Sequence, residues 1–359
     1  MSKVHDMRAI GVSFLLCAGL FMATPAGAEQ PLSRTDKVLW TICTITLHDH
    51  ATEKVLDECF ARLREIDSRM STNVPGSLLD AVAAQAGKSP VRVTDDVMFV
   101  ARKALSMAGI SDGLFDPTVG PLMKVWKMEG ENPEVPRQAD IDAARKLVNW
   151  RDVVLDESAK TIFLRRPSMH LDFGALVKGY AADEVVRILF ERGVKSAIVD
   201  LGGDIYAMGS SPAKALWRIG VQNPESERGA VLGIVRVTNE AVVTSGVYEH
   251  YFIKDGKRYH HIMDTRTGYP VDNGLTSVTV VAPKSVDADG FGLLLFCEGT
   301  EEGLKLGERL GLGVIMVDMQ RRVFVTSQVQ RYFSLTNPDF TLENEVSHVP
   351  EATPSSMAP

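Results

Sequence analysis

The chain has 359 residues with 46 acidic and 39 basic side chains, which gives a formal net charge of −7 at pH 7. A nucleic-acid partner favours a basic surface, so this acidic balance argues against one. At this length the chain can bury a large core, either as one big domain or as two lobes.

Residues 1–28 read as a secretory signal peptide. Lys3 and Arg8 give a weakly positive start, an apolar run follows at Ala9–Ala23, and Ala26–Ala28 is a small-residue cleavage signal. The run is too short for a membrane span, and an uncleaved N-terminal anchor is the alternative interpretation. Signals of this kind are typical of bacteria, so we expect a periplasmic protein that is cleaved near Ala28.

The rest of the chain mixes predicted helices and strands without regular alternation or repeats. Helical spacing of apolar residues predicts the helices, and alternating β-branched runs predict the strands. The predicted elements, in chain order, are a strand at Leu39–Leu47, a helix at Thr52–Ile66, a polar loop at Met70–Leu79, a helix at Asp95–Ala108, a loop that turns helical at Gly113–Trp126, a helix at Gln138–Lys146, a hairpin at Val153–Leu164, a helix at Lys178–Arg192, strands at Ser196–Leu201, Trp217–Gln222, Val231–Val237, Val242–Ser245 and Ser277–Val281, helices at Ser285–Phe296 and Glu301–Leu310, and a hairpin of Gly313–Asp318 with Val323–Thr326. This mix predicts an α+β fold.

Two further features concern the mature chain. Its cysteines are Cys43, Cys59 and Cys297. They show no C-x-x-C pair and no metal-type spacing, so we expect buried thiols and at most one disulfide. From about Asn337 the sequence becomes rich in Pro, Ser and Glu, which predicts a disordered tail over residues 337–359.

The segment Leu171–Asp183, LDFGALVKGYAAD, carries the most chemical information. Asp172 precedes the small residues Gly174 and Ala175, and Lys178 follows at the start of a predicted helix. A junction of this kind offers backbone N–H groups and the positive end of a helix dipole to a phosphate. The sequence therefore indicates a phosphate-bearing ligand, such as a nucleotide.

Each of the other motifs has an ordinary structural reading beside the functional one. The glycine pair in Asp200–Asp204, DLGGD, is either a second phosphate-binding loop or a simple turn. Asp116 before Pro117 is usually a turn residue or a cap. Asp287 and Asp289 most often provide a helix N-cap. A polar cluster at His260–Pro270, HHIMDTRTGYP, completes the set.

Six ordered blocks together resemble the ApbE-type flavin transferases (FAD:protein FMN transferases), and the resemblance runs from about Leu39 to Thr326. The blocks are GLFDPTVGPL at Gly113–Leu122, DFGALVKGYAAD at Asp172–Asp183, VDLGGDIYAMG at Val199–Gly209, TSGVYEHYF at Thr244–Phe252, HIMDTRTGYP at His261–Pro270 and DADGFGLLLFCEG at Asp287–Gly299. The resemblance implies one transferase domain over residues 29–336. It also implies a two-lobed α+β fold with a T-fold-like core and FAD in the cleft between the lobes.

The resemblance also assigns roles, residue by residue. It implies a magnesium ion at the FAD pyrophosphate, held by the main-chain carbonyl of Ala175 and the carboxylate of Asp289. His261 and Asp264 become the candidates for proton transfer. The residues expected to contact FAD are Asn73, Leu114, Phe115, Asp116, Asp172, Lys178, His261 and Ile262.

The sequence departs from the family pattern at several positions. The family usually has a threonine four residues after its metal carboxylate, where this chain has Leu293, which cannot be a ligand. Some members carry an acid one residue earlier, where this chain has Gly292. Val247, Thr265 and Trp40 replace the usual Asp, Pro and Gly in three other motifs. The implied metal site is therefore depleted, and it is completed by water or Asp287, or it is absent.

The resemblance implies an exported enzyme that moves FMN from FAD to a threonine or serine of a periplasmic or membrane redox protein and releases AMP. Its partners are then FAD and the flavin-accepting subunit of a membrane redox complex. Leu293 favours a second reading, a non-catalytic FAD-binding protein. A third is hydrolysis of FAD to FMN and AMP. The sequence fixes neither the acceptor nor an oligomeric state.

Overall fold

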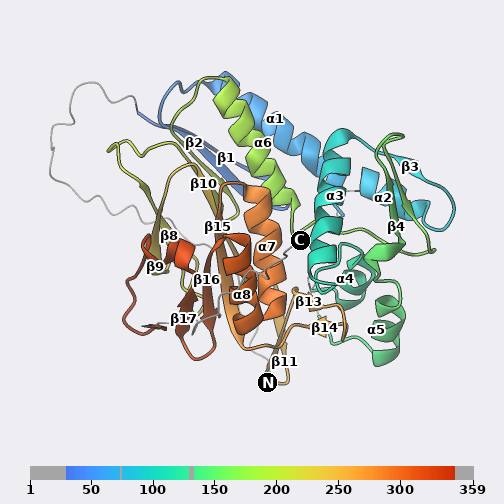
Figure 1. Ribbon diagram of the computed structural model, residues 1–359. Helices are drawn as coiled ribbons and strands as arrows, with labels where there is room; N and C mark the ends of the chain where they lie inside the picture. Colours follow the sequence, from blue (N-terminus) through green and yellow to red (C-terminus); the bar gives the residue numbers. More distant parts are fainter. Residues whose placement is uncertain (1–29, 73–74, 129–132, 344–359) are drawn as a thin grey trace, which may run out of the picture. The chain divides into compact units, whose positions relative to one another are not determined.

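The computed structural model describes residues 30–72, 75–128 and 133–343. Its centre is a nine-stranded sheet in the order β1-β2-β6-β7-β10-β15-β16-β17-β19 (Figure 1). Neighbouring strands are antiparallel except for β17 and β19. The strands are β1 (Leu32–Val38), β2 (Thr41–Leu47), β6 (Ala197–Leu201), β7 (Asp204–Met208), β10 (Glu240–Gly246), β15 (Leu275–Ala282), β16 (Gly313–Asp318), β17 (Arg322–Val325) and β19 (Thr341–Leu342).

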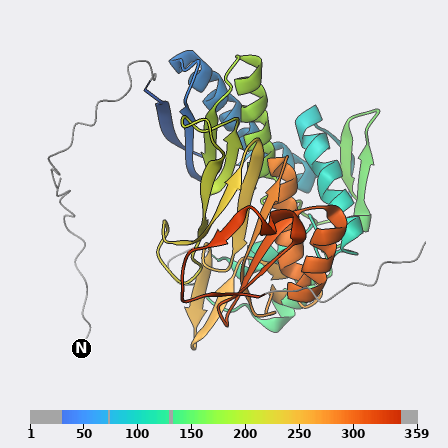
Figure 2. The same ribbon diagram turned by 60° about the vertical axis from the view of Figure 1, so that its left-hand side comes forward.

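Both faces of this sheet are buried, and strand alternation explains how. Successive residues of a strand point to opposite faces. Val243 and Val280 belong to the main core, under the helices, whereas their neighbours Val242 and Val281 belong to a second core on the other face. Figure 2 shows helices α7 and α8 along one side of the strands. The helices that contribute to the main core include α1 (Glu53–Met70), α3 (Asp95–Ile110), α6 (Val177–Glu191), α7 (Ser285–Glu298) and α8 (Thr300–Leu310), and α2 (Leu78–Ala84) adds Leu79 and Val82.

Smaller units complete the fold. A three-stranded sheet of β8 (Trp217–Gln222), β9 (Val231–Val237) and β18 (Phe333–Leu335) covers the second core. A third apolar cluster joins two helices to the hairpins near residue 261. The remaining elements are β3 (Val91–Arg92), α4 (Gly120–Trp126), α5 (Gln138–Arg145), β4 (Val153–Asp156), β5 (Thr161–Leu164), β11 (Tyr251–Lys254), β12 (Lys257–His260), β13 (Met263–Asp264), β14 (Tyr269–Pro270), α9 (Ser327–Gln330) and a 3-10 turn at Trp150–Asp152.

The α+β prediction is confirmed, and the predicted helices match the observed ones closely. Sequence reasoning missed the short helices α2 and α9 and the strands β1, β3, β7, β11, β12, β13, β14, β18 and β19. It also placed the domain end at residue 336, whereas β19 pairs with β17 beyond that point and Phe340 is buried. Cys43, Cys59 and Cys297 are free, buried thiols, as expected. Within residues 30–72, 75–128 and 133–343, no helix is long and apolar enough to cross a membrane. The predicted signal peptide and residues 344–359 of the tail lie outside these ranges.

Candidate active site

Helices α6 and α7 cross in close contact, and each caps the other. The Asp183 carboxylate of α6 accepts hydrogen bonds from the N–H groups of Ser285 (2.9 Å) and Val286 (3.1 Å) at the start of α7. In return, Asp289 Oδ2 of α7 accepts the N–H of Gly179 (2.9 Å) in the first turn of α6. These N–H groups have no partner inside their own helices, so the two carboxylates fix how the helices meet.

A lysine stands between two carboxylates at this crossing. Lys178 Nζ donates to Asp204 Oδ2 and lies 3.6 Å from Asp289 Oδ1. Burial alone would lower the pKa of Lys178, but the Asp204 and Asp289 carboxylates outweigh it and raise that pKa. Burial raises the pKa of Asp204, and Lys178 opposes that rise. The ammonium therefore stays charged at neutral pH beside two buried carboxylates.

Two adjacent histidines differ in which nitrogens are engaged. His260 uses both: Nε2 lies 2.9 Å from the Val271 carbonyl, and Nδ1 accepts the Ile262 N–H (3.3 Å). His261 Nδ1 lies 3.3 Å from the carbonyl oxygen of His250. A carbonyl can only accept, so Nδ1 carries the proton and Nε2 keeps a lone pair. In the described chain no hydrogen bond to His261 Nε2 is found.

The protonation state of His261 suits proton acceptance. Burial, with the positive charge of neighbouring groups, lowers the pKa of His261 to about 3. Its imidazole is therefore neutral at physiological pH. Lys178 is among the charges that contribute to this shift. A neutral imidazole with a free Nε2 is the form that a general base needs.

Asp116 organises the loop before α4. Its Oδ1 accepts the N–H (2.8 Å) and the hydroxyl (2.6 Å) of Thr118, and its Oδ2 accepts the Trp150 N–H (2.9 Å). Thr265, which replaces the proline of the family pattern, donates its hydroxyl to the Gly113 carbonyl (2.7 Å). This bond ties the segment that carries His261 to the loop at residues 113–118.

Replacing Asp116 with alanine is expected to lower the free energy of unfolding by roughly 2–4 kcal/mol. The side chain is buried, and its loss leaves three donors without their acceptor. Urea unfolding monitored by circular dichroism measures the change. Asp272→Ala is the matched control, because its side chain is exposed and pairs with Lys257 on the surface. Equal stability of the two variants would contradict this role.

The other predicted site residues occupy varied positions. Asp172 Oδ1 accepts the Gly174 N–H (2.8 Å), and burial raises the pKa of Asp172. Asp264 forms an ion pair with Arg266 (Nε to Oδ1, 3.1 Å) and accepts its N–H. Leu114, Phe115 and Ile262 are buried. Asn73 lies outside the described residues.

The structure distinguishes between alternatives that the sequence left open at two motifs. Gly202 and Gly203 form the two-residue turn between β6 and β7, and both of their N–H groups are used, by the Ile42 carbonyl and by Asp200. They do not make a second phosphate-binding loop. Asp287 forms an ion pair with Lys103 of α3. Positions two apart on a helix do not share a face, so Asp287 does not complete the site at Asp289.

The oxygen atoms of Asp289 and the Ala175 carbonyl suit a hard cation such as Mg²⁺, although they do not surround an ion. In the part of the chain that the structure describes, no group of three His, Cys, Asp or Glu side chains gathers for a metal. Mg²⁺ needs few protein oxygens and keeps several waters. Oδ1 of Asp289 lies 3.6 Å from the Lys178 ammonium, and the Ala175 carbonyl is the second implied ligand. Leu293 packs against the main core and supplies no oxygen.

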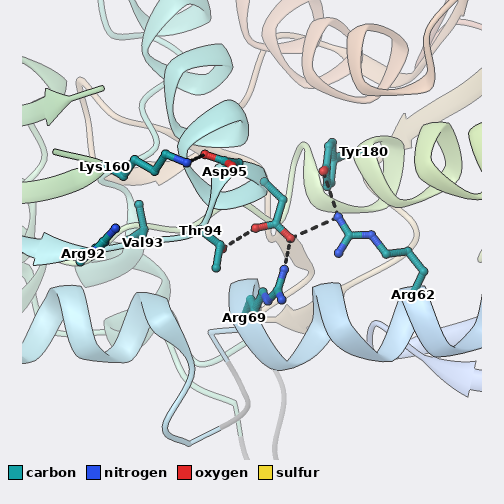
Figure 3. Close-up of a pocket in the computed structure, with 9 residues that line it drawn as sticks. Arg62, Arg69, Arg92, Val93, Thr94, Asp95, Lys160 and Tyr180 are labelled. Carbon is teal, nitrogen blue, oxygen red and sulfur yellow. Dashed lines mark hydrogen bonds and ion pairs between the residues drawn. The ribbon is translucent and has the colours of Figure 1, made fainter. Parts of the chain in front are cut away.

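A pocket of about 540 Å³ lies elsewhere, between α1, α3 and α6 (Figure 3). Arg62 and Arg69 converge there on the Asp96 carboxylate, at 3.2 and 2.6 Å. Lys160 pairs with Asp95 on the rim. The lining carries four basic side chains (Arg62, Arg69, Arg92 and Lys160) against two acidic ones (Asp95 and Asp96), so it is net positive. Its ion pairs link α1 to α3, and Arg62 also pairs with Glu184 of α6. The pocket contains none of the residues of the Lys178 cluster.

Sequence reasoning missed Asp204 as a site residue. The acid stood in the DLGGD motif, but its importance arises because β7 places it against Lys178, 26 residues earlier in the chain. A buried carboxylate requires a partner. No sequence signal marked Asp204, because the strand that carries it, β7, was itself missed.

Comparisons with known proteins agree with this site and fold. The ApbE family model matches residues 39–316. A FAD:protein FMN transferase of Klebsiella pneumoniae (strain 342) is 35% identical over 291 residues, which is 81% of this chain and 90% of that protein. A protein of the same name from Treponema pallidum (strain Nichols) is 31% identical and covers 93% of this chain and 97% of its own.

A solved structure gives the same answer. The structure titled flavin transferase ApbE from Vibrio cholerae matches with a TM-score of 0.78 at 26% identity, over 85% of this chain and 100% of that one. The resemblance drawn from the six sequence blocks is thereby confirmed. Because the family model spans most of the chain and its relatives exceed 30% identity, this protein belongs to the ApbE family.

Proposed function

We propose that this protein transfers FMN from FAD to a threonine or serine hydroxyl of an acceptor protein and releases AMP. One observation carries the proposal: Lys178, Asp204 and Asp289 form a compact charged cluster. We assign the proton transfer to His261, whose imidazole is neutral. The fold and the names of the relatives support the same reaction. The acceptor that we propose is a flavin-accepting subunit of a membrane redox complex.

The transfer needs positioning and charge neutralisation more than covalent help from the enzyme. The acceptor oxygen forms a bond to the phosphorus on the FMN side of the pyrophosphate. The bond from that phosphorus to the bridging oxygen breaks, and the oxygen leaves with AMP. His261 Nε2 takes the hydroxyl proton, and the Lys178 ammonium neutralises charge on the phosphoryl oxygens.

We also propose that Mg²⁺ binds the Asp289 carboxylate and the Ala175 carbonyl. When bound, the ion supplies positive charge to the pyrophosphate oxygens. The protein residues keep separate tasks: Gly179 orients Asp289, and Asp204 holds Lys178. The N-terminal sequence supports export, so we place the reaction in the periplasm.

FAD is expected to bind at least about tenfold more tightly than riboflavin. Riboflavin lacks the phosphates that Lys178 and the start of α6 should hold, and each charge-assisted contact contributes roughly 1.5–3 kcal/mol. Isothermal titration of the mature protein with each ligand measures both affinities. Equal affinities would mean that the phosphates are not recognised.

The Leu293→Thr variant tests whether residue 293 still borders the metal site or has become an apolar position in the core. If residue 293 still borders the site, the threonine hydroxyl lowers the Mg²⁺ concentration needed for half-maximal FMN transfer. The structure favours the second result, because Leu293 packs against the core. We therefore expect a loss of about 1–3 kcal/mol in stability and an unchanged Mg²⁺ curve. A lower Mg²⁺ requirement would contradict this expectation.

The same variant bears on the non-catalytic alternative that Leu293 suggests. Tight FAD binding, with no FMN transfer in wild type or variant, would favour a flavin-binding protein. AMP formation from FAD without any acceptor would instead favour hydrolysis. Chromatography of FAD, FMN and AMP, with and without the acceptor, distinguishes these outcomes.

A further inference from the structure

Asp204 binds the active-site lysine from the protein interior. Its side chain is 5% exposed, whereas that of Lys178 is 30% exposed. A carboxylate this deep contacts the ammonium but is too buried to meet a large substrate. Asp204 therefore acts through Lys178.

The oxygens of Asp289 have different partners. Oδ2 accepts the Gly179 N–H, so Oδ1 is the oxygen left for a cation. The Lys178 ammonium lies 3.6 Å from Oδ1 and within direct hydrogen-bond reach of Asp204. A lysine without the Asp204 carboxylate would move onto Asp289, because that is the other carboxylate near it. It would then compete with a metal ion for Oδ1.

We propose that Asp204 is a positioning residue that holds the Lys178 ammonium away from Oδ1 of Asp289 and so keeps this oxygen available to Mg²⁺. The inference rests on the proposed function, because Mg²⁺ at Asp289 is part of that function. The inference adds that the two carboxylates have different roles. Asp204 takes the lysine, Asp289 takes the metal, and the substrate meets two separate positive charges.

Loss of negative charge alone would also weaken binding of a cation, and a neighbouring carboxylate serves as the control. Asp200 lies in the same β6–β7 hairpin, and its Oδ1 accepts the Gly203 N–H instead of pairing with Lys178. Asp200→Asn removes one negative charge near the site and leaves the lysine in place. Asp204→Asn removes the same charge and also releases the lysine.

The experiment titrates Mg²⁺ into the mature protein by calorimetry, with and without FAD, and follows the melting temperature of each variant. We expect Asp204→Asn to raise the Kd for Mg²⁺ by about tenfold or more, and Asp200→Asn to change it by less than about twofold. Adding Lys178→Met to Asp204→Asn should restore the Kd to within about threefold of wild type. Lys178→Met alone should tighten Mg²⁺ binding, and this arm stands even if Asp204→Asn fails to fold.

Three results would overturn the inference: an unchanged Kd in Asp204→Asn, equal effects of Asp204→Asn and Asp200→Asn, or weaker Mg²⁺ binding in Lys178→Met. Failure of the proposed function looks different. If the wild type binds no Mg²⁺ with or without FAD, the metal assignment to Asp289 is wrong and the inference falls with it. If the wild type binds Mg²⁺ and only the variants disagree, the inference alone is wrong.

Discussion

Replacing Asp289 with alanine is expected to lower the rate of Mg²⁺-dependent FMN transfer by about a hundredfold. The change removes the carboxylate that we propose as a ligand of Mg²⁺. It also leaves the Gly179 N–H without its acceptor, which costs roughly 1–3 kcal/mol in the free energy of unfolding. Initial rates over a Mg²⁺ titration, together with urea unfolding, measure both losses.

Asp289→Asn separates the two roles of this carboxylate. Its amide oxygen still accepts the Gly179 N–H, so the crossing of α6 and α7 is kept, while the negative charge is lost. We expect near-wild-type stability with FMN transfer as low as in the alanine variant. Wild-type turnover of Asp289→Ala at every Mg²⁺ concentration would show that the metal assignment is wrong.

Gly179→Ala is expected to be the most destabilising small substitution at the site. A Cβ atom there would lie 2.4 Å from the Ser285 carbonyl oxygen and 2.7 Å from Val286 Cα, and both are backbone atoms. The helices would have to separate, which costs roughly 2–4 kcal/mol. FMN transfer should fall as well, because Lys178 and Asp289 would move apart. Urea unfolding and transfer rates measure the two effects.

Gly109→Ala is the matched control for this substitution. Gly109 is also helical, in α3, and the nearest atom to an added Cβ is Trp150 Cη2 at 3.8 Å, an ordinary contact. Alanine favours helix over glycine by about 1 kcal/mol, so this variant should be neutral or slightly more stable. Similar losses in both variants would mean that the close contact of α6 with α7 does not limit stability.

Most of the helices and the order of the site segments were predictable from the sequence. The predicted helices at Lys178–Arg192 and Ser285–Phe296 correspond to α6 and α7, and both carry residues of the site. β1 was missed because it is an edge strand, LSRTDKV, in which polar side chains alternate toward solvent and few apolar residues mark it. β7 was missed because it follows a turn of only two residues, so no loop separates it from β6.

The partners of the charged residues were not predictable from the sequence. Asp287 and Asp289 look equivalent in the motif, and only tertiary packing shows that one pairs with Lys103 while the other receives the Gly179 N–H. Likewise, His260 and His261 are adjacent, and the difference between them comes from the carbonyls of Val271 and His250. Sequence spacing identifies candidates, and long-range contacts assign their roles.

The intact mass of an acceptor tests the central claim most directly. The mature protein, FAD and Mg²⁺ are incubated with the periplasmic domain of a flavin-accepting redox subunit from the same genome, and AMP is measured in parallel. The account predicts that the acceptor gains the mass of one FMN less one water, with one AMP released per adduct. A variant of the acceptor without the target hydroxyl should gain nothing. AMP release with no change in the mass of the acceptor would contradict the account and indicate FAD hydrolysis instead.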